Sequence, residues 1–139
     1  MAKNLPVEIP GAKPSVKAGK VECTNCHDFS KPQTFANIST ACVQCHDAAY
    51  VDLLKGLRAE ILENQKKTKD LLDRAGKKLK DARKKNREIV QPAALLERAK
   101  KAYDFVTKGK AAHNFDLASL LLEQGQKDAQ RAMELLPSP

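Results

Sequence analysis

Two short motifs contain all four cysteines and two of the three histidines of this 139-residue chain. They are "CTNCH" at Cys23 to His27 and "CVQCH" at Cys42 to His46. C-x-x-C-H is the attachment signature of haem c, because two cysteines three positions apart can form thioethers to both vinyl groups while the next residue points at the iron. The motifs therefore predict two covalently attached haem c groups, bound by Cys23, Cys26, Cys42 and Cys45, with His27 and His46 as iron ligands.

The same cysteines leave a second interpretation open. Counted from Cys26 to Cys42, the spacing C-x2-C-x15-C-x2-C lies in the range of a four-cysteine zinc site. Zinc would not require a histidine after each pair, and disulfides would not explain the histidines either. A thioredoxin-type redox pair would come with a βαβ pattern, which this sequence lacks. We favour haem and keep a zinc-binding module with a basic surface as the alternative.

The third histidine, His113, lies in "KAAHNFDLASLL", between two amphipathic segments. Haem c irons commonly take a second imidazole, and His113 is the only one left to supply it. We therefore predict that His113 is a distal iron ligand, the alternative being an ordinary inter-helix histidine. Three histidines cannot give two bis-histidine irons. The haem on His46 would then lack a second histidine from this chain, which leaves an open-site haem sensor or enzyme as a further alternative.

The elements that must position these residues are predicted to be helices. Residues 1–20 carry three prolines and are expected to form an extended arm. Residues 21–46 form the haem-attachment segment, in which turn-forming "DFSKPQTF" separates the motifs and helix signals are few. Residues 47–136 supply the helices, so that 21–139 make up a single domain. Apolar residues with three- and four-residue spacing predict its first helix: Leu54, Leu57, Ile61, Thr68, Leu71, Ala75, Leu79 and Ala82.

That first helix is expected to reach about residue 85, either unbroken or with a bend at Gly76. Pro92 is placed to open a second helix at its first position, and Gly109 ends it. Asn114 or Asp116 can cap a third helix, "FDLASLLLEQGQKDAQRAMELL". No alternating pattern is long enough for a strand. The predicted fold is all-α, an irregular dihaem-binding head followed by a long helical hairpin or three-helix bundle.

The composition restricts the classes of molecule that the chain is expected to bind. The formal net charge is +8, and residues 66–87 hold eleven Lys or Arg against three Asp. We interpret this stretch as a solvated helix face, the alternative being a docking surface for an acidic redox partner. It has neither interleaved aromatics nor a known nucleic-acid module, and no stretch of the chain is apolar enough for a membrane span. The aromatic candidates for haem contact are Phe29, Phe35, Tyr50 and Phe115.

The first 20 residues have no apolar h-region, so they are not expected to be a signal peptide. Haem c is attached outside the bacterial cytoplasm. The haem interpretation therefore predicts a periplasmic or extracellular protein and requires a removed leader, an added initiator Met or a longer precursor. The zinc interpretation requires none of these, which is its strongest support.

The segments "CTNCH", "CVQCHDAAYVDLL" and "AAHNFDLASLLLEQG" resemble, in order and spacing, the C-terminal part of the cytochrome c nitrite reductases and related multihaem cytochromes. That resemblance covers roughly residues 21–136. It implies that His27 and His113 are the axial pair of the first haem, and that the helices pair subunits. The family's catalytic haem is bound by a motif with Lys in place of the histidine, and no C-x-x-C-K occurs here.

We therefore expect a dihaem c-type cytochrome, or a domain of a larger multihaem cytochrome, that transfers single electrons between redox partner proteins and is not itself an enzyme. The long apolar seam of the helices leaves room for a homodimer or a larger multihaem assembly.

Overall fold

In a computed structural model of the protein, residues 22–109 and 114–136 are described, and their regular structure is entirely helical. No strand occurs in these ranges, so the all-α prediction is confirmed. The expected arm, residues 1–20, lies outside the described residues. In chain order the elements are the 3-10 helix η3 (Cys23–Asn25), α1 (Phe35–Cys42), α2 (Ala49–Lys84), α3 (Val90–Gly109) and α4 (Phe115–Leu135).

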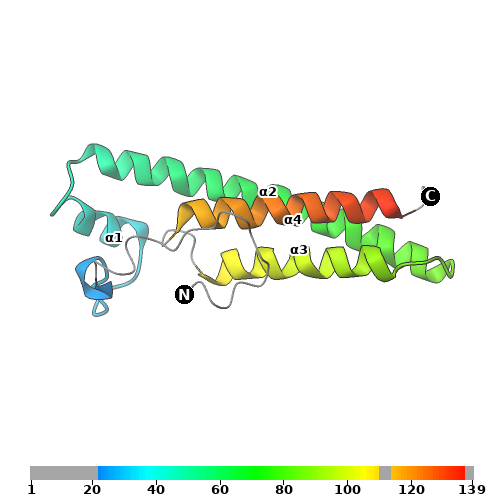
Figure 1. Ribbon diagram of the computed structural model, residues 1–139. Helices are drawn as coiled ribbons and strands as arrows, with labels where there is room; N and C mark the ends of the chain where they lie inside the picture. Colours follow the sequence, from blue (N-terminus) through cyan, green and yellow to red (C-terminus); the bar gives the residue numbers. More distant parts are fainter. Residues whose placement is uncertain (1–21, 110–113, 137–139) are drawn as a thin grey trace.

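Helices α2, α3 and α4 pack against one another as a three-helix bundle, with α3 running back along α2 and α4 reversing again (Figure 1). The three helices differ in length. With a rise of about 1.5 Å per residue, the 36 residues of α2 span about 54 Å, whereas the 20 of α3 and 21 of α4 span only about 30 Å each. The first turns of α2 therefore extend past the other two helices.

Small residues dominate the core of the bundle and allow the helices to pack closely. Gly125 shows how closely they approach, since a Cβ added there would lie 3.4 Å from the Ala99 carbonyl oxygen and 3.6 Å from Thr68 Cγ2. The core forms two clusters. The one nearer the start of α4 contains Ile61, Ala102, Val106, Ala118, Leu121 and Leu122, and the other contains Leu72, Ala75, Leu96, Ala99 and Ala129.

Buried polar residues fix how the helices align. Thr68 is fully buried, donates its hydroxyl proton to the Asn64 carbonyl and accepts a hydrogen bond from Gln126 Nε2 at 3.0 Å. Arg98 donates through Nε and Nη2 to both carboxylate oxygens of Asp128, which is only 3% exposed. The hydrogen bonds to that carboxylate raise the pKa of the Arg98 guanidinium. Such bidentate pairs are satisfied in only one register, so they specify the α3–α4 alignment.

The ends of α2 follow from residues on either side of it. Just before the helix, the Asp47 carboxylate accepts a hydrogen bond from the N–H of Ala49, the first residue of α2, at 2.7 Å. At the other end Asn86 adopts a φ of 51°, the left-handed conformation that commonly ends helices. Between these points the helix is continuous through Gly76, so the unbroken helix was the correct choice of the two expected.

Two local expectations from the sequence are wrong. Residues 35–42, where helix signals are few, form α1, because Thr34 Oγ1 accepts a hydrogen bond from the Asn37 N–H at 3.2 Å and caps the helix. Pro92 is the third residue of α3 rather than the first. A proline is tolerated there because the N–H groups of a first turn have no intrahelical acceptor. The Gly109 end of α3 and the Asn114 cap of α4 agree with the sequence.

Within residues 22–109 and 114–136, no helix is both long enough and apolar enough to cross a membrane.

We predict that Arg98→Met destabilises the protein by about 3 kcal/mol, because it leaves the buried Asp128 carboxylate without its cation. The matched control is Arg131→Met, which removes an exposed pair with Glu134 and should cost less than about 1 kcal/mol. Urea unfolding followed by circular dichroism measures both. Equal effects of the two substitutions would show that the Arg98–Asp128 pair does not stabilise the bundle.

Candidate cofactor-attachment site

The two C-x-x-C-H motifs adopt the same backbone turn. In each, the N–H groups of the second cysteine and of the histidine both donate to the carbonyl of the first cysteine. The distances are 3.2 and 2.9 Å in the first motif and 3.3 and 2.9 Å in the second. η3 contributes the first turn, and the C-terminal end of α1 contributes the second. In both places two sulfur atoms and one imidazole therefore extend from a single turn of chain, the arrangement that thioether attachment requires.

All four cysteines are free thiols. Cys23 and Cys45 are exposed and Cys26 and Cys42 are half-buried, so each pair presents one open and one partly covered sulfur. Within the described residues, no three side chains among Cys, His, Asp and Glu gather into a metal-binding group. The two cysteine pairs thus do not converge on the single tetrahedral set that a four-thiolate zinc site needs.

The imidazole of His27 is oriented by Gln33. His27 Nδ1 lies 2.7 Å from Gln33 Oε1, while Gln33 Nε2 donates to the carbonyl oxygens of Asp28 and Lys31 at 2.7 and 2.8 Å. Because the amide nitrogen faces two acceptors, its oxygen must face the imidazole, and Nδ1 must carry the proton. Nε2 is then the ring nitrogen through which His27 would bind a metal. Metal-binding histidines are typically oriented in this way, by a hydrogen bond from the ring nitrogen that does not bind the metal.

A tight turn supports the carbonyls that hold Gln33. The Asp28 carboxylate accepts hydrogen bonds from the Ser30 N–H and hydroxyl and lies 2.9 Å from Lys31 Nζ. The hydrogen bonds from Ser30 and the neighbouring Lys31 cation lower the pKa of Asp28 from an ordinary 3.8 to about 2. The Asp28 carboxylate therefore keeps its charge, and with it the hydrogen bonds of this turn, to a lower pH than an ordinary Asp would.

His46 is supported differently from His27. Its ring stacks on Tyr50 at 4.1 Å between centroids, with an interplanar angle of 11°. His27 makes a looser stack with Phe29, at 5.8 Å and 20°. Tyr50 is on the first turn of α2, directly after the motif, so α2 contributes to positioning the second imidazole. The two motifs thus adopt the same backbone turn, but different side chains contact their histidines.

The head that carries both motifs has almost no protein core. From residue 22 to residue 60 the only buried side chain is Ser39, and the first buried residue of α2 is Ile61. Yet this part of α2 has apolar side chains with helical spacing, and Leu53 is 54% exposed. A hollow of about 220 Å³ between the first motif and α1 includes Cys26 in its lining. The half-buried or exposed apolar residues of α2 before Ile61 are Tyr50, Val51, Leu53, Leu54 and Leu57.

The head folds back beside α2 rather than continuing in line with it (Figure 1). Phe35, at the start of α1, lies under the Arg58 guanidinium at 5.1 Å from the ring centroid. Ile61, one turn further along α2, packs in the core cluster that contains Ala118 of α4. The head, the start of α4 and the end of α3 are therefore all at the same end of the bundle.

His113 itself lies outside the described residues, which resume at Asn114, the residue that caps α4 through a 3.1 Å bond from the Leu117 N–H. The four aromatic candidates for haem contact separate into two groups. Phe29, Phe35 and Tyr50 are in the head or beside it, whereas Phe115 packs against the bundle core.

Comparisons with known proteins returned no match to this chain among protein-family models, curated proteins or solved structures.

Sequence reasoning missed Gln33. The residue lies in the stretch that the sequence identifies only as turn-forming, six positions after His27. Its role depends on a turn that brings the amide back to the imidazole, and no fixed spacing in the sequence signals such a turn.

We predict that Gln33→Leu lowers the Nδ1–H population of His27 about fivefold, since the acceptor for that proton is lost. Nitrogen NMR chemical shifts of the cofactor-free chain report the tautomer of each imidazole. Gln33→Glu, which keeps an acceptor oxygen, is the matched control and should retain the Nδ1–H form. The His46 tautomer should not change in either variant. An unchanged His27 in Gln33→Leu would mean that Gln33 does not set the tautomer.

Proposed function

We propose that the protein is a dihaem c-type cytochrome, or a cytochrome domain of a larger assembly, that transfers single electrons between redox partners. The observation that carries the proposal is the pair of identical C-x-x-C-H turns, each with two free thiols and an imidazole on one turn of chain. When bound, haem supplies one-electron redox chemistry, and the protein tunes it through the axial ligands and their hydrogen bonds.

The residues present fit two haems in three respects. The thiols of Cys23 and Cys26, and those of Cys42 and Cys45, are unpaired and can each add across one vinyl group, forming one C–S and one C–H bond with no atom lost. Gln33 engages Nδ1 of His27, so that Nε2 is the ring nitrogen that would bind iron. A head without a core of its own also suits a large apolar cofactor as its interior.

The histidine that follows each cysteine pair favours haem over the zinc module, because a four-thiolate zinc site does not require it. One zinc ion would need all four sulfur atoms about 2.3 Å from a common point, whereas two haems need each pair only in its own turn. The absence of a Lys-ligated motif from the sequence favours electron transfer over nitrite-reducing chemistry of the resembled family.

We further propose that His113 is the distal ligand of the haem on His27. The support is positional: Gly109 ends α3 and Asn114 caps α4 at the end of the bundle beside the head. The haem on His46 has no further histidine in this chain, so its sixth position is left to another group or stays open.

Expression with a c-haem maturation system should give a chain whose mass increases by two haems, because each thioether pair retains one. Replacing Cys23 and Cys26 by Ser should leave one haem, as should replacing Cys42 and Cys45. The two double variants serve as controls for each other. A zinc adduct without haem in the matured wild-type chain would overturn the proposal.

His113→Ala should convert the haem on His27 from a low-spin to an open or substitute-ligated iron, and leave the haem on His46 unchanged. Electron paramagnetic resonance of the ferric protein separates these species. Asn114→Ala is the matched control, since it removes the adjacent helix cap, at about 1 kcal/mol, but no imidazole. If the haem on His46 changes instead, the ligand assignment is inverted; if neither changes, His113 is not a ligand.

A further inference from the structure

The net charge of the protein is concentrated at the C-terminal end of α2 and in the turn that follows it. The chain has 25 Lys or Arg and 17 Asp or Glu, a net of +8. Residues 74–87 hold eight of these cations and one of the acids, so +7 of the net charge comes from this stretch alone. The cations are Arg74, Lys77, Lys78, Lys80, Arg83, Lys84, Lys85 and Arg87.

The cations of this stretch are not engaged in ion pairs with the described residues. Several lysines elsewhere on the helices pair with an acid one turn away, as Lys55 does with Asp52 and Lys101 with Glu97. Within the described residues, none of the eight cations in 74–87 lies within ion-pair distance of a carboxylate. Like charges three and four positions apart on a helix repel, so this stretch destabilises its own helix unless anions bind to it.

The location of the stretch separates it from the haem motifs. The turn between α2 and α3 forms the end of the bundle opposite the head (Figure 1). From Arg58, which contacts Phe35 of the head, to Lys80, α2 rises by about 33 Å. A partner bound here would be remote from both C-x-x-C-H turns. The alternative interpretation of this stretch as the docking surface for an electron-exchanging partner is therefore disfavoured by distance.

The tip also carries exposed apolar surface. Val90, the first residue of α3, is 75% exposed, and Ile89 beside it is half-buried. They follow the basic residues Lys84, Lys85 and Arg87, with Glu88 between, whose carboxylate accepts a hydrogen bond from the Val90 N–H at 2.8 Å. No aromatic residue occurs from 74 to 93, so the surface offers no stacking platform for nucleic-acid bases. Apolar residues close to clustered cations instead suit insertion among lipid headgroups.

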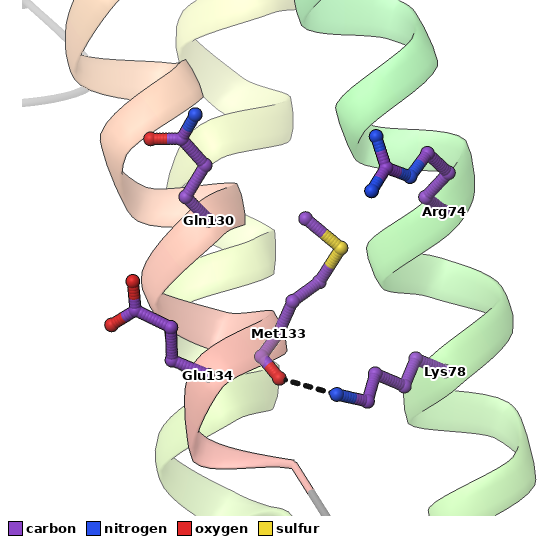
Figure 2. Close-up of a pocket in the computed structure, with 5 residues that line it drawn as sticks. All are labelled: Arg74, Lys78, Gln130, Met133 and Glu134. Atoms are coloured by element: carbon purple, nitrogen blue, oxygen red, sulfur yellow. Dashed lines mark hydrogen bonds between the residues drawn. The ribbon is translucent and has the colours of Figure 1, made fainter. Parts of the chain in front are cut away.

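Near the tip the basic surface meets α4 at an open groove. Figure 2 shows Arg74 and Lys78 of α2 facing Met133 of α4 across this groove, with Lys78 Nζ donating to the Met133 carbonyl oxygen at 2.7 Å. Lys78 is thus engaged at the end of α4, and it is the only one of the eight cations that is not fully exposed. The other seven are available to an external partner.

We propose that this tip, formed by the cations of residues 74–87 together with Ile89 and Val90, binds anionic lipid headgroups and holds the head away from the membrane surface. Phosphate-bearing headgroups match an array of exposed cations without requiring a shaped pocket. Each Lys or Arg at such a surface adds about 1 kcal/mol, or roughly fivefold in partition. The interaction is screened by salt and so weakens at high ionic strength.

The test is co-sedimentation of the full chain with phosphatidylcholine vesicles that contain or lack phosphatidylglycerol, at low and high salt. We expect binding only with phosphatidylglycerol, and loss of that binding at high salt. Combining Lys80→Gln, Arg83→Gln, Lys84→Gln and Arg87→Gln should weaken binding several hundredfold, given about fivefold per cation. Circular dichroism checks that each variant remains helical.

The matched control removes the same charge elsewhere: Lys55→Gln, Lys67→Gln, Lys69→Gln and Lys101→Gln together should bind nearly as the wild type does. Equal loss in both quadruple variants, or no binding to phosphatidylglycerol vesicles, overturns the proposal. Val90→Ser should weaken vesicle binding about threefold to tenfold. If Val90→Ser has no effect and the tip binds duplex DNA or heparin as tightly as vesicles, the surface recognises a polyanion and not a lipid. None of these outcomes depends on haem, so the test is independent of the proposed function.

Discussion

The length of α2 exceeds that of the helices packed on it, and the remainder of the structure depends on this mismatch. α3 and α4 can cover α2 only from about Ile61 to Ala82, where the buried residues lie. The twelve residues of α2 before Ile61 have apolar side chains at helical spacing but contribute none to the bundle core. Exposed apolar surface is unfavourable in water. Burial of this segment would therefore need contacts with an apolar group other than α3 and α4.

The head lies beside this apolar segment of α2, so a single apolar group can cover both. It folds back along α2, contacts it through Phe35 and Arg58, and directs two C-x-x-C-H turns into a region with a single buried side chain. A covalently attached apolar cofactor would serve both surfaces at once, as the interior of the head and as the cover of the first turns of α2. Redox chemistry and local stability would then depend on the same contacts.

Much of the bundle could be predicted from the sequence because its signals are local. Periodic residues such as Thr68, Ala75 and Ala82 are buried as expected, and Asn114 caps α4. In α3 Leu96 is buried and its neighbour Leu95 is only half-buried, a difference that apolar spacing alone does not predict. α1 was missed since eight residues give little periodicity, and its cap at Thr34 is a single weak signal.

The candidate site was predictable only in part. The spacing of cysteines and histidines can be read directly from the sequence, so the two motifs could be identified and their turns predicted. The orientation of His27 depends on Gln33, and that of His46 on Tyr50, through contacts that arise only when the chain folds. The register of α3 against α4 likewise depends on Arg98 and Asp128, which are 30 positions apart and appear in the sequence as ordinary surface charges.

The central claim is that both cysteine pairs bind haem covalently, and the pyridine haemochrome spectrum of the matured protein tests it most directly. The absorbance position distinguishes haem linked through two thioethers from haem with free vinyl groups, and its intensity gives the amount of haem per chain. The account predicts a ratio of two, with both haems linked through two thioethers. A ratio of zero, with zinc present instead, would contradict it.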